Sequence, residues 1–127
     1  MKDIKDKIKS YEDLEVYQKL CKLHLEVHSL TLTFPDFEKY ELGSQLRKSS
    51  NSAPANLAEG WNNKHINIYL EGINRAQSET QETKHHLFIA FKKAYITEEK
   101  CSYFIQGYDS CGKMLSGLKK SLEKYIT

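Results

Sequence analysis

Apolar side chains recur at helical spacing in four separate segments of this chain, and this pattern limits the possible folds more than any other feature. In three of the segments the spacing alternates between three and four residues, which places the apolar side chains along one side of an α-helix. The positions are Val16, Leu20, Leu23, Val27, Leu30 and Phe34; Leu42, Leu46, Ala53, Leu57 and Trp61; Tyr69, Ile73, Ala76, Thr80, Thr83, Leu87, Ala90 and Ala94; and Cys101, Phe104, Tyr108, Cys111, Leu115, Leu118, Leu122 and Tyr125. Long helices with short connections pack as near-antiparallel neighbours. The sequence therefore predicts an all-α fold, an up-down antiparallel four-helix bundle.

Prolines, glycines and capping residues predict where these helices begin and end. The predicted boundaries are Pro35 after the first helix, Asp36 as the cap of the second, Gly60 with Asn62 and Asn63 as the next break, Lys64 and Ala94 as the limits of the third, and Thr97 as the cap of the fourth. Proline disfavours helical geometry in the residue before it, and aspartate and threonine side chains accept hydrogen bonds from free N–H groups at a helix start. Glycine and asparagine are chosen for the break because they tolerate left-handed geometry.

Pro54 lies inside the second predicted helix, in the polar run 49–56. Proline has no N–H and clashes with the preceding turn, so the helix is expected to kink or restart there. Ser50 or Ser52 is a candidate cap for a restart or a donor to the freed carbonyls. A structural kink and a ligand-binding bend both fit the pattern. In an oligomer, the segment Ser49–Pro54 and the small residues Ala76, Thr80 and Thr83 are candidate packing surfaces between copies.

Composition places the chain among soluble proteins of a reducing compartment. Residues 11–127 are predicted to form one domain, preceded by a flexible charged arm over Met1–Ser10. The longest apolar run, Leu87–Phe91, is far shorter than the ~20 residues needed to cross a bilayer, and the N-terminal lysines have no apolar core behind them. Three cysteines without a CxxC pair suit free thiols. We therefore expect a cytoplasmic protein with no membrane partner.

Motifs of enzymes and metalloproteins are largely missing from the sequence. It contains no GxGxxG, GxxxxGK[ST], GxSxG or HExxH pattern. His24 and His28 have a spacing that can hold a metal, but a surface or boundary role fits them as well. Glu82 and His85 form a single Glu-x-x-His motif, whereas di-iron bundles use two. We predict no catalytic residue, no metal site, no cofactor and no small-molecule substrate.

Basic residues offer the remaining functional signal. Lysines crowd the end of the fourth helix, where they complement the helix dipole; a patch that contacts phosphates is the functional alternative. The candidate nucleic-acid-binding residues are Arg47, Lys48, Arg75, Lys119 and Lys120. The formal net charge of only +2 does not by itself indicate a nucleic-acid binder.

Several short stretches of the sequence resemble those of a known family. They are YEDLEVYQ (11–18), FP (34–35), SQLRK (44–48), APANLAEG (53–60), YL (69–70), SET (78–80), YI (95–96) and MLSGL (114–118). In this order they are similar to the 23S rRNA intervening-sequence protein family, also called the four-helix bundle protein family, over roughly residues 11–123. Tyr17 stands where the family commonly has Trp, Trp61 where Phe is usual, and Ser49–Ser50 replaces a stretch rich in alanine.

The resemblance implies a four-helix bundle that assembles into a barrel-shaped homopentamer and has no catalytic activity. A relative, the accessory protein of diversity-generating retroelements, is a basic pentamer that works with a reverse transcriptase and nucleic acid. Our leading hypothesis is thus a non-enzymatic homo-oligomeric scaffold that engages structured RNA or an RNA-bound protein through Lys and Arg side chains. The alternative is a protein-binding adaptor without direct nucleic-acid contact, for example for a reverse-transcriptase-like partner. Phe37, Tyr40, Phe88 and Phe91 are available for subunit or partner contacts.

Overall fold

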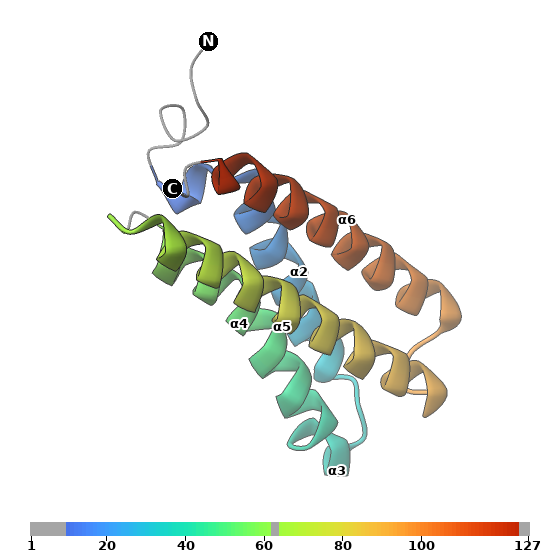
Figure 1. The fold of residues 1–127 in the computed structure, drawn as a ribbon. Helices are drawn as coiled ribbons and strands as arrows, with labels where there is room; N and C mark the ends of the chain where they lie inside the picture. The colour runs from blue at the N-terminus through green and yellow to red at the C-terminus, as the bar shows by residue number, and fades with distance from the viewer. Residues whose placement is uncertain (1–9, 62–63, 125–127) are drawn as a thin grey trace.

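The computed structural model describes residues 10–61 and 64–124, and nearly all of them lie in helices (Figure 1). The elements in chain order are the 3₁₀ turn η1 (Tyr11–Asp13), α2 (Glu15–Thr31), the one-turn α3 (Asp36–Lys39), α4 (Leu42–Gly60), α5 (Ile66–Lys92) and α6 (Glu98–Glu123). The predictions for the arm up to residue 9, for Asn62 and Asn63, and for Tyr125 lie outside the described residues. Ser10, placed in that arm by prediction, instead caps η1 in a capping box with Asp13.

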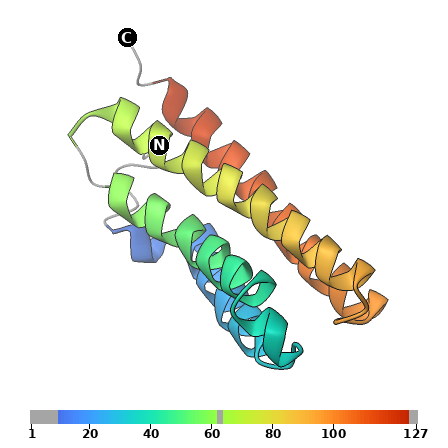
Figure 2. The same ribbon diagram turned by 90° about the horizontal axis from the view of Figure 1, so that it is seen from below.

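The four long helices form a bundle, as predicted. Seen from below, α5 and α6 form one layer and α2 and α4 the other (Figure 2). Among the described elements, α4 and α5 make the most extensive contact, whereas α2 and α6 make the least of the four neighbouring pairs. The bundle is therefore closed tightly along α4–α5 and loosely along α2–α6.

Each predicted apolar position from Val16 to Leu122 is buried, with the exception of Ala94. Two pairs of polar side chains lie within this interior. Thr83 Oγ1 lies 2.8 Å from Ser49 Oγ, and His24 Nδ1 lies 2.7 Å from Ser50 Oγ. Ser49, Ser50 and Pro54 are buried within the chain, as are Ala76, Thr80 and Thr83. The prediction that these segments pack between copies is therefore wrong: they are small so that α4 can approach its neighbours in the same chain.

The start of the second helix differs from the prediction. Asp36 lies in the first turn of α3 behind Pro35, and α4 begins only at Leu42, after a break at Tyr40 and Glu41. The buried Glu38 holds α3 in place: it accepts hydrogen bonds from Lys93 Nζ and Tyr95 Oη, each at 2.8 Å. These partners come from the α5–α6 connection, so they cannot be foreseen from the local sequence.

Gly60 ends α4, as predicted, but its backbone does not have the left-handed geometry that was the reason for the prediction. No described glycine has a positive φ. A Cβ on Gly60 would lie 2.8 Å from Ile68 O and 3.2 Å from Gly72 Cα, and one on Gly72 would lie 2.9 Å from Asn56 O. The two glycines therefore allow the backbones of α4 and α5 to meet directly. Nearby, α4 continues through Pro54 as one helix and does not restart.

Left-handed geometry occurs instead at Ala94, which has a φ of 64°. The N–H of Tyr95 donates to Ala90 O and the N–H of Ala94 donates to Phe91 O, each at 2.9 Å. This is the hydrogen-bond pattern of a Schellman motif, which usually has glycine at the position that Ala94 occupies. The helix thus ends two residues before the predicted apolar period does, and Ala94 is exposed.

Candidate functional site

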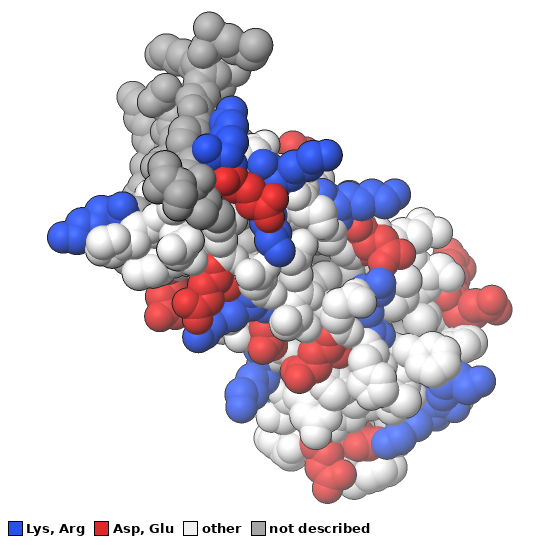
Figure 3. Space-filling view, in the orientation of Figure 1, with Lys and Arg blue, Asp and Glu red and all other residues white. Residues whose placement is uncertain are grey.

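Three basic residues lie near the end of α6, Lys113 and Lys120 on one side of the helix and Lys119 about 100° around it, towards the half-buried side. Lys113 and Lys120 are exposed and Lys119 is half-buried. Lys120 follows Lys113 by seven residues, two helical turns, so their side chains leave the same side. Within the described residues none of the three forms an ion pair with a carboxylate. We call Lys113, Lys119 and Lys120 the α6 basic face; Figure 3 shows blue side chains gathered over this half of α6.

The other three predicted nucleic-acid-binding residues do not join this face. Arg47 is a structural residue: Nη1 donates to Thr31 Oγ1 and Nη2 to Lys39 O, both at 2.8 Å, which closes the connection between α2 and α4. Arg75 is exposed but forms a 2.6 Å ion pair with Glu71. Lys48 is exposed on α4. The sequence could not show this difference, because Thr31 and the carbonyl of Lys39 come close to Arg47 only when the connection between α2 and α4 is folded.

Buried charge at the opposite end of the bundle serves the fold. Glu38 is 3% exposed, and its hydrogen bonds from Lys93 and then Tyr95 hold the pKa of its carboxyl below the usual range. The same contact raises the pKa of Lys93. Both groups are therefore charged at neutral pH and bind each other, and the Lys93 ammonium is occupied by this contact.

No metal centre or nucleophile is assembled within the described residues. They contain no group of three or more His, Cys, Asp or Glu side chains placed to hold a metal ion. His24 pairs with Ser50, and burial lowers its pKa. Burial also raises the pKa of the Cys101 thiol, and raises that of Cys111 to about 11, so both thiols stay protonated at neutral pH. Ser50 is completely buried beside His24, so no substrate reaches that pair.

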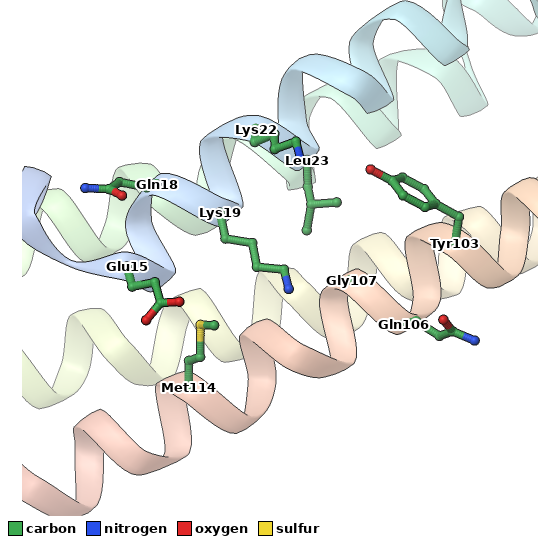
Figure 4. A pocket seen from close by; sticks show the side chains of 9 residues that line it. All are labelled: Glu15, Gln18, Lys19, Lys22, Leu23, Tyr103, Gln106, Gly107 and Met114. Atoms are coloured by element: carbon green, nitrogen blue, oxygen red, sulfur yellow. The ribbon is translucent and has the colours of Figure 1, made fainter.

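The loose contact between α2 and α6 opens a groove along the bundle. Three hollows of about 550, 590 and 610 Å³ follow one another there. The first two share Glu15 and Met114, and the last two share Tyr103. Together they form one continuous surface, which we call the α2–α6 groove. Figure 4 shows its middle part, where Lys19 extends from α2 and Tyr103 from α6. Lys19 Nζ donates to Ser110 Oγ at 3.0 Å and Tyr103 Oη donates to Glu26 Oε2 at 2.6 Å.

Apolar side chains on this groove are exposed to an unusual degree. Leu25 is 66% exposed and Tyr103 is 50% exposed. Large apolar side chains gathered on one surface are typical of a protein contact. Sequence reasoning missed this groove; the signal available was Leu25, an apolar residue of α2 outside the predicted buried positions. Of the aromatic residues predicted to be available, Phe37, Tyr40 and Phe88 are exposed and Phe91 is partly buried.

Within the described residues, no helix combines the length and the apolar character needed to span a membrane.

Comparison with known proteins gives a family and a fold. A sequence model of the family described as 23S rRNA-intervening sequence protein matches residues 12–117. A crystal structure of a protein of unknown function from the S23 ribosomal protein family of Bacteroides thetaiotaomicron superposes with a TM-score of 0.77 at 22% identity, over 83% of this chain and 95% of that one. At this identity the likeness shows the fold alone. No curated protein matches the sequence at a significant level. The comparisons indicate no catalytic family.

Proposed function

The chain belongs to the 23S rRNA-intervening sequence protein family, and on this basis we propose that it is a non-enzymatic scaffold that assembles with copies of itself and binds structured RNA. The observation that carries the proposal is the α6 basic face. Lysines without carboxylate partners on a rigid helix contact phosphates through charge, with low sequence specificity. The family description, which names an rRNA context, agrees with an RNA ligand but assigns no activity.

The test is binding of a labelled structured rRNA fragment, titrated from low to physiological salt. We expect the double variant Lys119→Glu/Lys120→Glu to bind more weakly and with a shallower dependence on salt, because fewer counterions are released. The matched control is Lys64→Glu/Lys92→Glu, which makes the same change in net charge with exposed lysines outside both the α6 basic face and the α2–α6 groove. Equal affinities for the wild type and the α6 variant contradict the proposal.

We further propose that copies of the chain meet at the α2–α6 groove and form the pentamer that the family resemblance implies. The exposed Leu25 and Tyr103 support this, since a monomer gains nothing from leaving them in water. Light scattering is expected to give a mass near five times 14.8 kDa. Leu25→Lys places a charge in the contact and is expected to lower that mass. Leu25 is not packed in the core, so this variant keeps its fold.

A protein-binding adaptor remains the second candidate function, and the same groove favours it. In that case the groove holds a partner protein, such as a reverse-transcriptase-like protein, and the lysines serve solubility. Two results together support the adaptor: retention of a partner protein that high salt and nuclease leave unchanged, and loss of that retention in Leu25→Lys. Retention that nuclease abolishes supports the RNA scaffold.

A further inference from the structure

A hollow of about 630 Å³ lies between α5 and α6, on the side of α6 away from the α2–α6 groove. Its volume falls within the range of roughly 300–1,000 Å³ that is typical of small-molecule sites. The residues that matter for the argument are Gln77, Thr80 and Gln81 on α5 and Tyr108, Gly112 and Lys113 on α6. We call it the α5–α6 hollow.

Two of its lining residues have buried hydroxyls without a hydrogen-bond partner in the described part of the chain, Thr80 Oγ1 and Tyr108 Oη. Thr80 is 2% exposed and Tyr108 is fully buried. Buried hydroxyls nearly always find a partner, as Thr83 does one turn further along α5 with Ser49 and Glu79 O. Buried hydroxyls without a partner in the chain are satisfied from outside it, by ordered water or by a ligand, and both of these residues line the hollow.

Gly112 provides the opening. A Cβ built on this glycine meets nothing within 4 Å, so the missing side chain leaves free space at the wall of the hollow. Contacts between the two helices border it on both sides: Gln77 Nε2 donates to Ser116 Oγ at 3.1 Å, and Lys84 pairs with Asp109 at 2.5 Å. The helices are thus held apart at a fixed distance around an unfilled position.

The hollow is continuous with the α6 basic face. Lys113 belongs to both. Lys119 follows Gly112 by seven residues and Lys120 follows Lys113 by seven, so both lie two turns further along the surface that lines the hollow. A phosphate chain bound to the lysines therefore passes beside the opening.

We propose that the α5–α6 hollow receives an unpaired nucleobase of the RNA that the α6 basic face binds, which rests on the proposed function. The lining offers hydroxyls and amides that both donate and accept hydrogen bonds, as the edge of a base requires. An anion is the poorer match, because the Asp109 carboxylate also lines the hollow. Specific recognition of RNA commonly uses such unstacked bases in loops and bulges. To reach the buried hydroxyls, the base displaces the side chains of Gln81 and Lys113, while Gln77 stays bonded to Ser116.

The first arm of the test compares two labelled hairpins of equal stem, one with a single bulged base and one fully paired. We expect the wild type to prefer the bulged hairpin about tenfold, the discrimination typical of a good pair of hydrogen bonds to a base. Gly112→Leu places a side chain at this position, where a Cβ meets nothing within 4 Å, and improves helix propensity, so we expect it to fold. It is expected to bind both hairpins equally. Ser102→Leu is the matched control: it adds the same side chain at an exposed position of α6 outside both the hollow and the α2–α6 groove, and keeps the preference.

The second arm adds ribonucleoside monophosphates to the isotope-labelled full chain and follows amide chemical shifts. We expect shifts around Gln81 and Gly112 that are absent in Gly112→Leu, and this arm reports on a free nucleotide without any RNA. Equal wild-type affinities for the two hairpins, or a preference that survives in Gly112→Leu, overturn the nucleobase site while leaving the scaffold intact. If the wild type binds neither hairpin, the proposed function fails, and the absence of nucleotide shifts then overturns the hollow as a base site as well.

Discussion

Replacing Gly72 with alanine is expected to destabilise the bundle, although alanine favours a helix. The new Cβ lies 2.9 Å from Asn56 O and 3.3 Å from Gly60 Cα, and both of these atoms belong to the backbone of α4. Optimal contacts between carbon atoms are about 3.5–4.0 Å, so α4 and α5 must separate by several tenths of an ångström. No side-chain rotation relieves the overlap. Overpacking of this kind costs typically about 1–3 kcal/mol.

Gly112→Ala isolates the packing effect. A Cβ at Gly112 meets nothing within 4 Å, and both glycines lie inside long helices. Each substitution gains roughly the same helix propensity, about 1 kcal/mol. The difference between the two variants therefore measures the overlap at the α4–α5 crossing alone, and we expect Gly72→Ala to be less stable than Gly112→Ala by about 2 kcal/mol.

Urea unfolding followed by circular dichroism measures this difference. For a slope of about 2 kcal/mol per molar urea, it corresponds to a separation of about 1 M between the two midpoints. All variants are compared at one protein concentration, because self-association stabilises the folded chain. If Gly72→Ala unfolds at the same midpoint as Gly112→Ala, the close approach of the two backbones is not what requires glycine, and the reasoning fails.

Two further predictions concern the connection between α5 and α6. Ala94→Gly relieves left-handed strain at the end of α5. After subtraction of the cost of a more flexible unfolded chain, it is expected to raise the free energy of unfolding by about 0.5–1 kcal/mol, measured by the same urea midpoints. A loss of stability contradicts the assigned helix end. Glu38→Gln removes the ion pair with Lys93 and is expected to lower stability at pH 7. Because the pKa of Glu38 is lowered in the folded state, its contribution is full above the unfolded value of about 4.3 and is lost as the pH falls through the folded value. The gap between wild type and variant should therefore close toward pH 3, and a gap that is constant with pH argues against this contact.

Much of the fold could be predicted because the period of apolar residues reports burial directly. The positions predicted from Val16 to Ala90 and from Cys101 to Leu122 are buried, and Thr97 caps α6 by accepting from the Lys100 N–H, as expected. The period does not say what a buried face packs against. For that reason the sequence makes the small residues of α4 and α5 candidates for contacts between copies, although they pack within one chain.

The candidate site was harder to predict because exposure and partners depend on tertiary structure. Lys119 and Lys120 lie together because they are neighbours on one helix. Arg47 is withdrawn from the surface by Thr31 and the carbonyl of Lys39. The α2–α6 groove and the α5–α6 hollow depend on where helices pack loosely or lack a side chain; in the sequence, only Leu25 points to the first and Gly112 to the second.

Gly60 and Gly72 also bear on how sequences of this fold can vary. Each glycine occupies space that a side chain on the other would need, so neither position can accept a larger residue while its partner helix stays in place. Most core positions can exchange one apolar residue for another with local repacking. These two positions lie in different helices but are expected to change together: a larger residue at either one requires the whole α4–α5 crossing to shift.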